Sequence, residues 1–338
     1  MKKLRVNLVS ESDFTVQGHG VHTAFLEMRQ SLEAQPDVVL TINAAPQKST
    51  DITHIHTVGT FALRRLLSQH GGKKVVSAHI VPASLVGSIV GARWWLPLFN
   101  GYLRRFYNRA DLVVAVSPAT RAELLALGVK TPIKVLGNFI DTQKYRTSPE
   151  QKVAFRQELK LPADRFMVVG NGQIQPRKKF ETFWAMAKSL PELQFVWVGG
   201  IPFKVLGDDY LRLSKAMKRP LPNLRVTGVV SLAEAGRYMR AADIMFMPSC
   251  QETFGLAILE GAASGLPVLV RDIPDYHATF GELVLRGEDE TFAAQILHLA
   301  EDPSFYAKWR ANSARLAAKY DTAAATERLM KLYRSILK

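Results

Sequence analysis

The chain has 338 residues, and its 44 Lys and Arg side chains outnumber its 30 Asp and Glu side chains, giving a formal net charge of +14. A hydrophobic content of 47% and a charged content of 22% exclude a disordered or collagen-like chain, and the length favours two domains. The single cysteine, Cys250, excludes an internal disulfide and suits a reducing compartment, while the positive charge favours polyanionic partners, whether nucleic acid, anionic lipid or phosphorylated small molecules.

Short apolar runs alternate with amphipathic segments in the first half of the chain. We predict strands, with helices between most of them, at Leu4–Ser10, Val38–Asn43, Ile52–Thr57, Lys74–Ile80 and Leu112–Ser117. Continuous apolar runs of this length, separated by helices, are typical of a parallel sheet covered on both faces. The first run ends at Ser10 and no small-residue cleavage site follows, so no secretory signal is predicted.

A glycine-containing loop follows the first predicted strand and includes Gly18 and Gly20. It lacks the third glycine of the dinucleotide-binding fingerprint, so it is a weak motif by itself. Glycine at these positions permits close approach of a ligand to the backbone. Two histidines of this region, His19 and His22, are either ligand-facing or ordinary loop and helix residues.

Three histidines lie on two later strands of the first half. His54 and His56 are two residues apart on one strand, so their side chains share one face, and we assign them a structural role. His79 ends the next strand, where a histidine ordinarily satisfies a backbone carbonyl.

The apolar stretch Ile80–Ala92 ends directly before Arg93 and contains only 13 residues. It is too short to span a membrane, because a spanning helix needs about 20 apolar residues. The next segment concentrates aromatic and basic side chains, among them Arg93, Trp94, Trp95, Arg104, Arg105 and Arg109. A basic amphipathic helix with Trp and Phe is typical of an element that lies in the headgroup region of an anionic membrane. In the alternative, the aromatic side chains pack against the first sheet and the arginines are solvated.

A second series of apolar runs begins after a polar stretch at 149–162. We predict strands, followed by an alanine-rich helical region, at Phe166–Gly172, Phe195–Gly199, Leu224–Gly228, Ile244–Ser249 and Pro267–Asp272. The predicted fold class is therefore α/β, with two doubly wound, Rossmann-like domains and a cleft between them. We place these domains at 1–150 and 151–315, and we expect a C-terminal helix at 316–338 to return to the first domain.

The turn after the first strand of the second series, Gly170–Lys179, ends in three basic residues. Cations in a strand-to-helix turn are well placed to neutralise a diphosphate, and each hydrogen bond to a charged group contributes about 1.5–3 kcal/mol. Arg177 and Lys178 are the candidates for this role. The alternative is a solvated turn.

Two glutamates, Glu252 and Glu260, are separated by seven residues across a predicted junction of strand, loop and helix. A helix that begins near Phe254–Gly255 would direct the amides of Phe254, Gly255 and Leu256 towards an anion. Both carboxylates would then be placed to accept hydrogen bonds from the hydroxyl groups of a polyol. The alternative is a capping glutamate and a solvated one.

Together with Glu260–Val268, these segments resemble glycosyltransferase family 4, which comprises retaining sugar-nucleotide enzymes of the GT-B fold. The resemblance implies that Glu260 binds the ribose hydroxyls of the nucleotide and that Glu252 binds the transferred sugar. It also implies that the amides following Thr253 contact the sugar and the diphosphate.

The resemblance extends to the cations and to the first half of the chain. Lys178 matches the lysine that binds the donor diphosphate in the family, whereas the usual arginine position is occupied by Gln173, so that either Arg177 or Gln173 takes its place. The family's glycine loop faces the diphosphate and the acceptor, and its strand-end histidine, here His79, contacts the donor sugar. The predicted catalytic residues are therefore His79, Glu252 and Lys178.

Several common cofactor motifs do not occur in the sequence, namely an Asp-x-Asp triplet, a zinc-spaced Cys/His set and a G-x-x-x-x-G-K-[ST] phosphate loop. We therefore predict no metal and no cofactor, and the resemblance implies UDP-hexose as the co-substrate. Cationic side chains are then expected to stabilise the departing UDP.

Longer phrases resemble a narrower group within the family, namely SAHIVPASLVGSIVGARWWLPL, YLRRFYNRADLVVAVS, GQIQPRKKF and FVWVGGIPF. This group consists of bacterial glycolipid synthases that add a second hexose to glucosyl-diacylglycerol, the anchor precursor of lipoteichoic acid. The resemblance implies a cytoplasmic enzyme, bound peripherally to the inner leaflet of the cell membrane. Its reaction would move a hexose from UDP-glucose or UDP-galactose to monoglucosyl-diacylglycerol.

Two other functions stay open at this point. A family 4 transferase with a soluble or polysaccharide acceptor would keep the donor site and need no membrane surface. A non-catalytic nucleic-acid-binding protein would use the charge of +14, but the sequence contains no recognised nucleic-acid module and the spaced glutamates would be unexplained. We therefore expect no nucleic-acid partner.

Overall fold

The computed structural model describes residues 3–15, 20–85, 92–201 and 221–338, except for the side chains of residues 83, 85 and 92–95. The chain folds into two compact units. Unit 1 contains the described residues up to Ile140 together with Tyr320–Lys338, and unit 2 contains those from Asp141 to Lys319. The chain therefore returns to unit 1 through its last helix.

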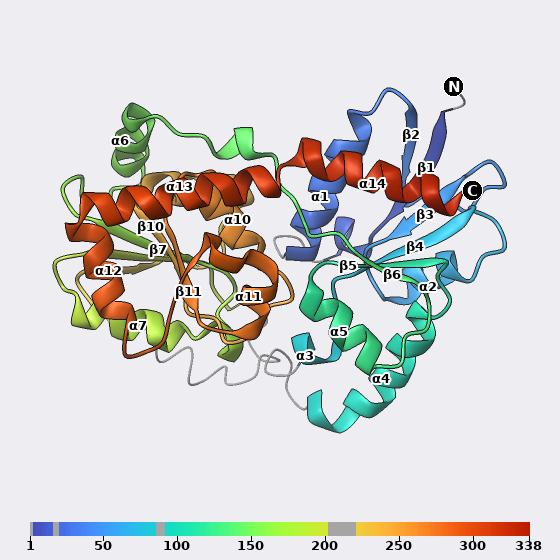
Figure 1. The fold of residues 1–338 in the computed structure, drawn as a ribbon, viewed down its shortest axis with the longest axis horizontal. Helices are drawn as coiled ribbons and strands as arrows, with labels where there is room; N and C mark the ends of the chain where they lie inside the picture. The colour runs from blue at the N-terminus through green and yellow to red at the C-terminus, as the bar shows by residue number, and fades with distance from the viewer. Residues whose placement is uncertain (1–2, 16–19, 86–91, 202–220) are drawn as a thin grey trace. The chain divides into compact units, whose positions relative to one another are not determined.

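Unit 1 is built on a six-stranded parallel sheet (Figure 1). In sheet order the strands are β2 (Val38–Ile42), β1 (Leu4–Val9), β3 (Ile52–Ile55), β4 (Lys73–Ala78), β5 (Leu112–Ala115) and β6 (Ile133–Val135). The order reverses beside β1, which makes the sheet doubly wound. The strands β3 and β5 are buried along their whole length, as the continuous apolar run of β5 predicts, whereas β3 also buries Thr53 and His54.

The described helices of unit 1 are α1 (Gly20–Glu33), α2 (Thr60–Leu66), α3 (Pro82–Leu85), α4 (Ala92–Tyr107), α5 (Pro118–Ala126) and α14 (Thr322–Ile336). The 3-10 turn η1 (Glu11–Asp13) lies between β1 and α1. The last helix, α14, is red in Figure 1 and packs beside α1. Its Leu329 and Tyr333 are buried in a core that also contains Phe25 of α1 and Leu8 of β1. The C-terminal helix thus completes the hydrophobic core of unit 1.

Unit 2 contains a second six-stranded parallel sheet. In sheet order its strands are β12 (Leu285–Gly287), β11 (Val268–Arg271), β10 (Ile244–Met247), β7 (Met167–Asn171), β8 (Gln194–Val198) and β9 (Leu224–Val226). The two sheets confirm the predicted α/β class with two doubly wound halves. The edge strands β6 and β12 were not predicted, because each has three residues and no long apolar run.

The described helices of unit 2 are α6 (Pro149–Glu158), α7 (Phe180–Ser189), α9 (Leu232–Ala241), α10 (Leu256–Ala263), α11 (Pro274–Phe280), α12 (Phe292–Glu301) and α13 (Pro303–Lys319), with the 3-10 turns η2 (Thr142–Tyr145), η3 (Pro176–Lys178) and η4 (Gly281–Leu283). The core of this unit combines aliphatic side chains with a cluster of aromatic rings. Phe183 of α7 contacts Phe195, Trp197 and Phe246 of the sheet at ring-centroid distances of 5.1–5.8 Å. Rings of this size bury much apolar surface and make the sheet a rigid base for its loops.

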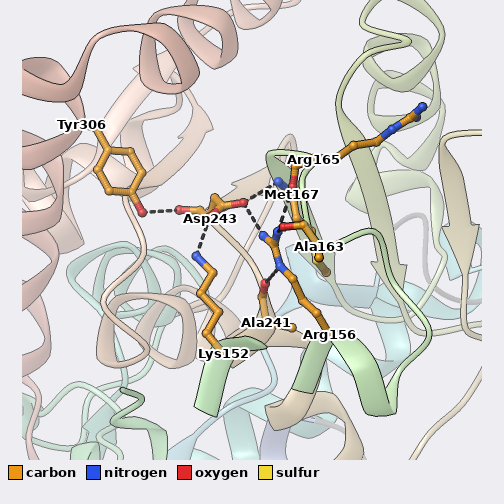
Figure 2. Close-up of polar contacts among 8 residues, drawn as sticks. All are labelled: Lys152, Arg156, Ala163, Arg165, Met167, Ala241, Asp243 and Tyr306. Carbon is orange, nitrogen blue, oxygen red and sulfur yellow. Dashed lines mark hydrogen bonds and ion pairs between the residues drawn. The ribbon is translucent and has the colours of Figure 1, made fainter. Parts of the chain in front are cut away.

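A carboxylate at the amino-terminal edge of the unit 2 sheet joins several elements (Figure 2). Asp243, directly before β10, pairs with Arg156 at 2.6 Å and with Lys152, both on α6. It also accepts a hydrogen bond of 2.6 Å from the backbone amide of Met167, the first residue of β7. Its own carbonyl accepts a hydrogen bond of 3.0 Å from the hydroxyl of Tyr306 on α13.

The guanidinium of Arg156 completes this Asp243 cluster. It is buried, and its Nε donates to the carbonyl of Ala241 at 2.9 Å. Its Nη1 donates to the carbonyls of Ala163 and Arg165 at 3.0 Å and 2.9 Å (Figure 2). The cluster therefore ties α6 to the beginnings of two central strands, far from the edge at which ligands bind in open α/β sheets.

Candidate active site

The candidate site of unit 2 is built on the turn that follows β7. Gly172 has a φ of +148°, a region that favours glycine, and its amide donates to the carbonyl of Val198 at 2.9 Å. Its carbonyl accepts a hydrogen bond of 3.0 Å from Trp197 Nε1. A Cβ atom at Gly199 would lie 2.1 Å from that carbonyl, so glycine is required where the two turns meet. The turn after β7 is therefore locked against β8.

Two cations follow in the short turn η3. Lys178 is buried and its Nζ pairs with Glu252 Oε1, while Arg177 Nη1 lies 3.3 Å from Glu252 Oε2. Arg177 Nη1 also donates to the carbonyl of Gln251 at 3.2 Å, and the Arg177 carbonyl accepts from the amide of Cys250 at 2.9 Å. These contacts bring together the two segments that the sequence singles out, the turn after β7 and the loop after β10.

The electrostatics of this cluster favour an ionised Glu252. Burial raises the pKa of the Glu252 carboxyl, but Lys178 and Arg177 outweigh burial and hold the pKa below its usual value. Burial lowers the pKa of Lys178, and the charge of Glu252 only partly offsets that effect. With all three groups ionised, the cluster carries a net positive charge, which suits an anionic ligand.

Gln173 supports Arg177 through a chain of side-chain hydrogen bonds. Gln175 Nε2 donates to Gln173 Oε1 at 3.0 Å, and Arg177 Nε donates to Gln175 Oε1 at 3.1 Å. Of the two residues considered for the family's arginine position, Arg177 lies against Glu252, and Gln173 is two hydrogen bonds away from Arg177.

The second glutamate of the predicted pair lies beside β7. Glu260 is buried just over one turn into α10, and Asn171, the last residue of β7, donates from its Nδ2 to Glu260 Oε2 at 3.0 Å. The segments that follow β7 and β10, including the first turns of α10, therefore hold both glutamates and the two cations at one edge of the sheet. Asn171 carries no motif, and its only signal in the sequence is a polar side chain at the carboxyl end of a strand, directly before Gly172.

The N-terminus of α10 adjoins the same loop. The helix begins at Leu256, slightly later than predicted, and its N-cap Gly255 has a φ of +86° and provides no side-chain hydrogen bond. The first amides of a helix have no acceptor within the helix, so they are available to an anion. Thr253 and Phe254 form the bend before Gly255, and the Phe254 ring packs on Phe280 at a centroid distance of 5.7 Å.

Three polar residues near Glu252 belong to no sequence motif. Both polar atoms of the Gln251 side chain are buried, and neither has a hydrogen-bond partner among the described residues. Burial, with a further contribution from the charge of Glu252, raises the pKa of Asp275 and of Tyr276. Because buried polar groups are nearly always hydrogen-bonded, the Gln251 amide has bonding capacity for a ligand.

In unit 1, three histidines lie in contact at the carboxyl ends of β3 and β4. His79 is buried, its Nε2 lies 3.1 Å from His56 Nδ1, and the two rings stack at a centroid distance of 5.1 Å. His54 is fully buried, and burial lowers its pKa to about 3. Although the three side chains adjoin, no group of three or more His, Cys, Asp or Glu in the described part of the chain is arranged to hold a metal ion.

The predicted glycine loop is described only in part. Gly18 and His19 lie outside the described residues. Gly20 is the exposed first residue of α1, and a Cβ atom placed there would contact nothing within 4 Å in the described structure. His22 is buried on the same helix. Packing against the described residues therefore does not require glycine at position 20.

The basic helix α4 presents two faces. Phe106 and Tyr107 are buried in the core of unit 1, as expected if the aromatic side chains pack against the sheet. Leu98 is 82% exposed, and the three arginines predicted there, Arg104, Arg105 and Arg109, are also exposed. The side chains of Arg93, Trp94 and Trp95 lie outside the described residues. Among the described helices, none is both long and apolar enough to cross a membrane.

Known proteins match the chain in both halves. Residues 10–144 match the family model described as Glycosyltransferase Family 4, and residues 162–302 match the model described as Glycosyl transferases group 1. An alpha-galactosylglucosyldiacylglycerol synthase of Streptococcus pneumoniae is 32% identical over 81% of this chain and 74% of that protein. A processive diacylglycerol alpha-glucosyltransferase of Acholeplasma laidlawii is 28% identical over 81% of this chain and 80% of that protein.

Solved structures share the fold along almost the whole chain. A crystal structure of Anabaena HepE in complex with UDP and glucose has a TM-score of 0.77 at 18% identity and covers 98% of this chain and 100% of that one. Sucrose-phosphate synthase from Thermosynechococcus elongatus has a TM-score of 0.79 at 18% identity, with 99% of each chain covered. These likenesses confirm the predicted GT-B fold.

Proposed function

The chain belongs to glycosyltransferase family 4, and on that basis we propose that it transfers a hexose from UDP-glucose or UDP-galactose to the glucose of monoglucosyl-diacylglycerol. The product is a diglycosyl-diacylglycerol, formed with retention of the anomeric configuration. The observation that carries the proposal is the cluster in unit 2 where Lys178 and Arg177 meet Glu252. The lipid products or acceptors named for the two similar glycolipid synthases support a lipid acceptor.

The cations of this cluster fit a nucleoside diphosphate. Lys178 and Arg177 share one carboxylate, so a diphosphate is able to take over their hydrogen bonds while the hydroxyl groups of the sugar donate to Glu252. The bond that breaks joins C1 of the hexose to an oxygen of UDP, and its electron pair leaves with UDP. Cations next to that oxygen stabilise the charge as it develops, which is commonly the largest single contribution of a protein to catalysis.

The remaining polar groups of the cluster fit the nucleoside and the sugar. An ionised carboxylate has about four acceptor positions, so Glu260 is able to bind the two ribose hydroxyls in addition to Asn171. The first amides of α10 face the diphosphate in this arrangement. The amide of Gln251 and the carboxyl of Asp275 adjoin Glu252, and we assign them to the one sugar hydroxyl whose orientation distinguishes glucose from galactose.

Unit 1 contributes the acceptor side in this proposal. The new bond joins a hydroxyl oxygen of the acceptor to C1 of the hexose, and the proton of that hydroxyl is released. We assign His79 to a hydroxyl of the transferred sugar and the glycine loop around Gly20 to the diphosphate and the acceptor. Both assignments rest on the family to which the chain belongs.

The exposed face of α4 is the proposed membrane contact. Arg104, Arg105 and Arg109 are exposed near the C-terminal end of the helix, and Leu98 exposes an apolar side chain one to three turns earlier. Each basic residue near an anionic leaflet contributes about 1 kcal/mol of binding free energy. We therefore propose peripheral binding to the inner leaflet of the cell membrane, where a diacylglycerol glycolipid is accessible.

The test of the reaction uses purified protein, vesicles that contain monoglucosyl-diacylglycerol and anionic lipid, and each UDP-hexose in turn. We expect one diglycosyl-diacylglycerol product by mass spectrometry, with the anomeric configuration read by NMR. Lys178→Ala and Glu260→Ala should each greatly reduce transfer in folded protein. Full activity in either variant, or no product with either UDP-hexose, would overturn the proposal.

The acceptor class is tested by sedimentation with anionic vesicles. We expect the wild type to sediment with them and a triple Ala variant of Arg104, Arg105 and Arg109 to bind more weakly. The matched control replaces three exposed basic residues of α13, namely Lys308, Arg310 and Arg315, and so removes the same charge elsewhere. Transfer to a soluble sugar without any vesicle binding would favour a soluble or polysaccharide acceptor instead.

A further inference from the structure

A buried column of side chains in unit 1 connects α1 and α14 to His79. Met28 of α1 places its Sδ 3.1 Å from His56 Nε2, and His56 Nδ1 lies 3.1 Å from His79 Nε2. On the other side, His54 contacts His56 ring to ring at a centroid distance of 4.9 Å. All four side chains are buried, so water does not replace these contacts.

The sulfur of Met28 determines where His56 carries its hydrogen. A thioether sulfur has lone pairs and no hydrogen, so it only accepts hydrogen bonds, and His56 Nε2 must be the donor. Burial, together with the neighbouring His54 and His79, holds the pKa of His56 well below 6.5. His56 is therefore neutral and carries one ring hydrogen, which leaves His56 Nδ1 as an acceptor.

The direction of the next hydrogen bond follows from this assignment. Because His56 Nδ1 carries no hydrogen, the contact of 3.1 Å with His79 Nε2 requires the hydrogen to be on His79. His54 does not compete for this acceptor, since its Nδ1 contacts the Tyr333 hydroxyl at 2.6 Å and its Nε2 contacts Ser77 Oγ at 2.8 Å. The chain of donors thus runs from His79 through His56 to Met28.

We propose that Met28 and His56 are positioning residues that fix His79 in the tautomer with hydrogen on Nε2. When His79 is in this neutral form, its acceptor lone pair is on Nδ1, and in the proposed transfer this nitrogen would accept a hydrogen bond from a hydroxyl group of the sugar. The tautomer itself follows from unit 1 alone. Its use for a sugar hydroxyl rests on the proposed glycosyl transfer.

The tautomers are measured by NMR on the whole protein labelled with ¹⁵N-histidine, in the absence of substrate and at neutral pH. Long-range ¹H–¹⁵N correlations show which ring nitrogen carries the hydrogen, and the variants His56→Asn and His79→Asn assign the signals. We expect hydrogen on Nε2 in both rings. Hydrogen on Nδ1 of either His56 or His79 would overturn the proposal.

The part of Met28 is tested with Met28→Leu, which keeps an apolar side chain and removes the acceptor. We expect a measurable share of His56 to change to the tautomer with hydrogen on Nδ1. Met186→Leu is the matched control, because Met186 is a buried methionine in the core of unit 2, and it should leave the histidine signals unchanged. An unchanged His56 tautomer in folded Met28→Leu protein would remove Met28 from the proposal.

The part of His56 is tested by comparing two substitutions in the transfer reaction. His56→Leu offers no acceptor, and we expect kcat to fall about tenfold, the order expected for one hydrogen bond. His56→Asn retains a side-chain oxygen for His79 Nε2, and we expect it to recover most of kcat. Thermal unfolding establishes that both variants are folded.

The outcomes separate the two proposals. Equal loss of kcat in folded His56→Leu and His56→Asn proteins would contradict a positioning role, because a mere packing defect does not distinguish them. Absence of any hexose transfer by the wild type would overturn the proposed function and the sugar contact. The NMR result on the tautomers would stand in that case, since it needs no substrate.

Discussion

Asp243 and Glu252 flank β10 in unit 2, and each carboxylate pairs with two cations. Asp243 precedes the strand, at the edge where Arg156 also binds three backbone carbonyls (Figure 2). Glu252 follows the strand, at the edge where the buried amide of Gln251 has no partner among the described residues. The same combination of charges therefore forms a closed structural cluster at one edge and a candidate ligand site at the other.

The difference lies in the hydrogen bonds that surround the charges. Lys152 and Arg156 extend from a regular helix, and Arg156 ties that helix to the start of the sheet. Arg177 and Lys178 extend from a short turn that ends at Lys179, a residue with a φ of +52°. Backbone conformations of this kind cost energy and gather at functional sites. A buried ion pair alone does not identify a site, whereas an ion pair beside buried polar groups that have no partner among the described residues is a candidate for one.

The largest expected effect comes from Asp243→Ala. This change leaves the buried guanidinium of Arg156 without its carboxylate, and breaking a buried ion pair costs about 3–5 kcal/mol of unfolding free energy. We expect a loss of that size in urea unfolding followed by far-UV circular dichroism. Hexose transfer per folded molecule should stay at the wild-type level.

The matched control for Asp243→Ala is Asp37→Ala. Asp37 pairs with Arg334 at 2.6 Å on the surface of unit 1, and ion pairs at the surface contribute about 0–1 kcal/mol. Equal losses of stability in the two variants would contradict the structural role of Asp243. Lost transfer in folded Asp243→Ala protein would contradict the separation of the two clusters.

The second prediction concerns Lys178→Ala. We expect kcat to fall about 10²–10³-fold, the range for removing one donor that stabilises charge in a transition state. The unfolding free energy should change less than in Asp243→Ala, because Glu252 keeps Arg177 at 3.3 Å. Lys152→Ala is the corresponding change in the Asp243 cluster, and it should lower stability and preserve kcat. The reverse pattern would show that the two clusters have been assigned to the wrong roles.

The third prediction uses pH to separate the contribution of Glu252. Its pKa in the folded protein lies below the value of 4.5 that it has when unfolded, because Lys178 and Arg177 outweigh burial. The ionised carboxylate therefore stabilises the fold above pH 4.5, and this contribution is lost as the pH falls through the folded-state pKa. In the Glu252→Gln variant, the unfolding free energy should therefore fall less steeply than in the wild type as the pH decreases below 4.5. Urea unfolding at a series of pH values measures this dependence.

The control for the pH experiment is Glu192→Gln, at an exposed glutamate of unit 2. The unfolding free energy of the Glu192→Gln variant should follow that of the wild type below pH 4.5. If Glu252→Gln also followed the wild type there, the charge of Glu252 would not be held by the two cations as the structure indicates.

The sequence singled out Glu252, Glu260 and Lys178 through the family resemblance, and in the structure all three lie in the segments that follow the central strands β10 and β7. Parallel strands bring such positions to one edge whatever the details of packing. The parallel sheets themselves follow from continuous apolar runs. The three-residue edge strands β6 and β12 have no such run, so they were missed.

Contacts between side chains that are far apart in the sequence could not be predicted. Arg156 and Asp243 are 87 residues apart, and a lone basic residue on a helix is ordinarily solvated. The contact of His56 with Met28 could not be predicted for a similar reason, since a methionine at helical spacing predicts only a core position. Such pairs depend on the angle at which a helix crosses the sheet, and a periodic pattern does not contain that angle.

The smallest expected effect, and the one that tests the ligand site most finely, comes from Asn171→Ala. Asn171 donates to Glu260 at 3.0 Å, and a hydrogen bond of this kind contributes about 1 kcal/mol. We expect KM for UDP-hexose to rise about fivefold with kcat nearly unchanged, because Glu260 would hold the ribose equally in the ground and transition states. Asn312→Ala, at a surface asparagine bonded to the carbonyl of Glu282, should leave KM unchanged. A fall in kcat without a change in KM would place Asn171 with the reacting sugar instead of the nucleoside.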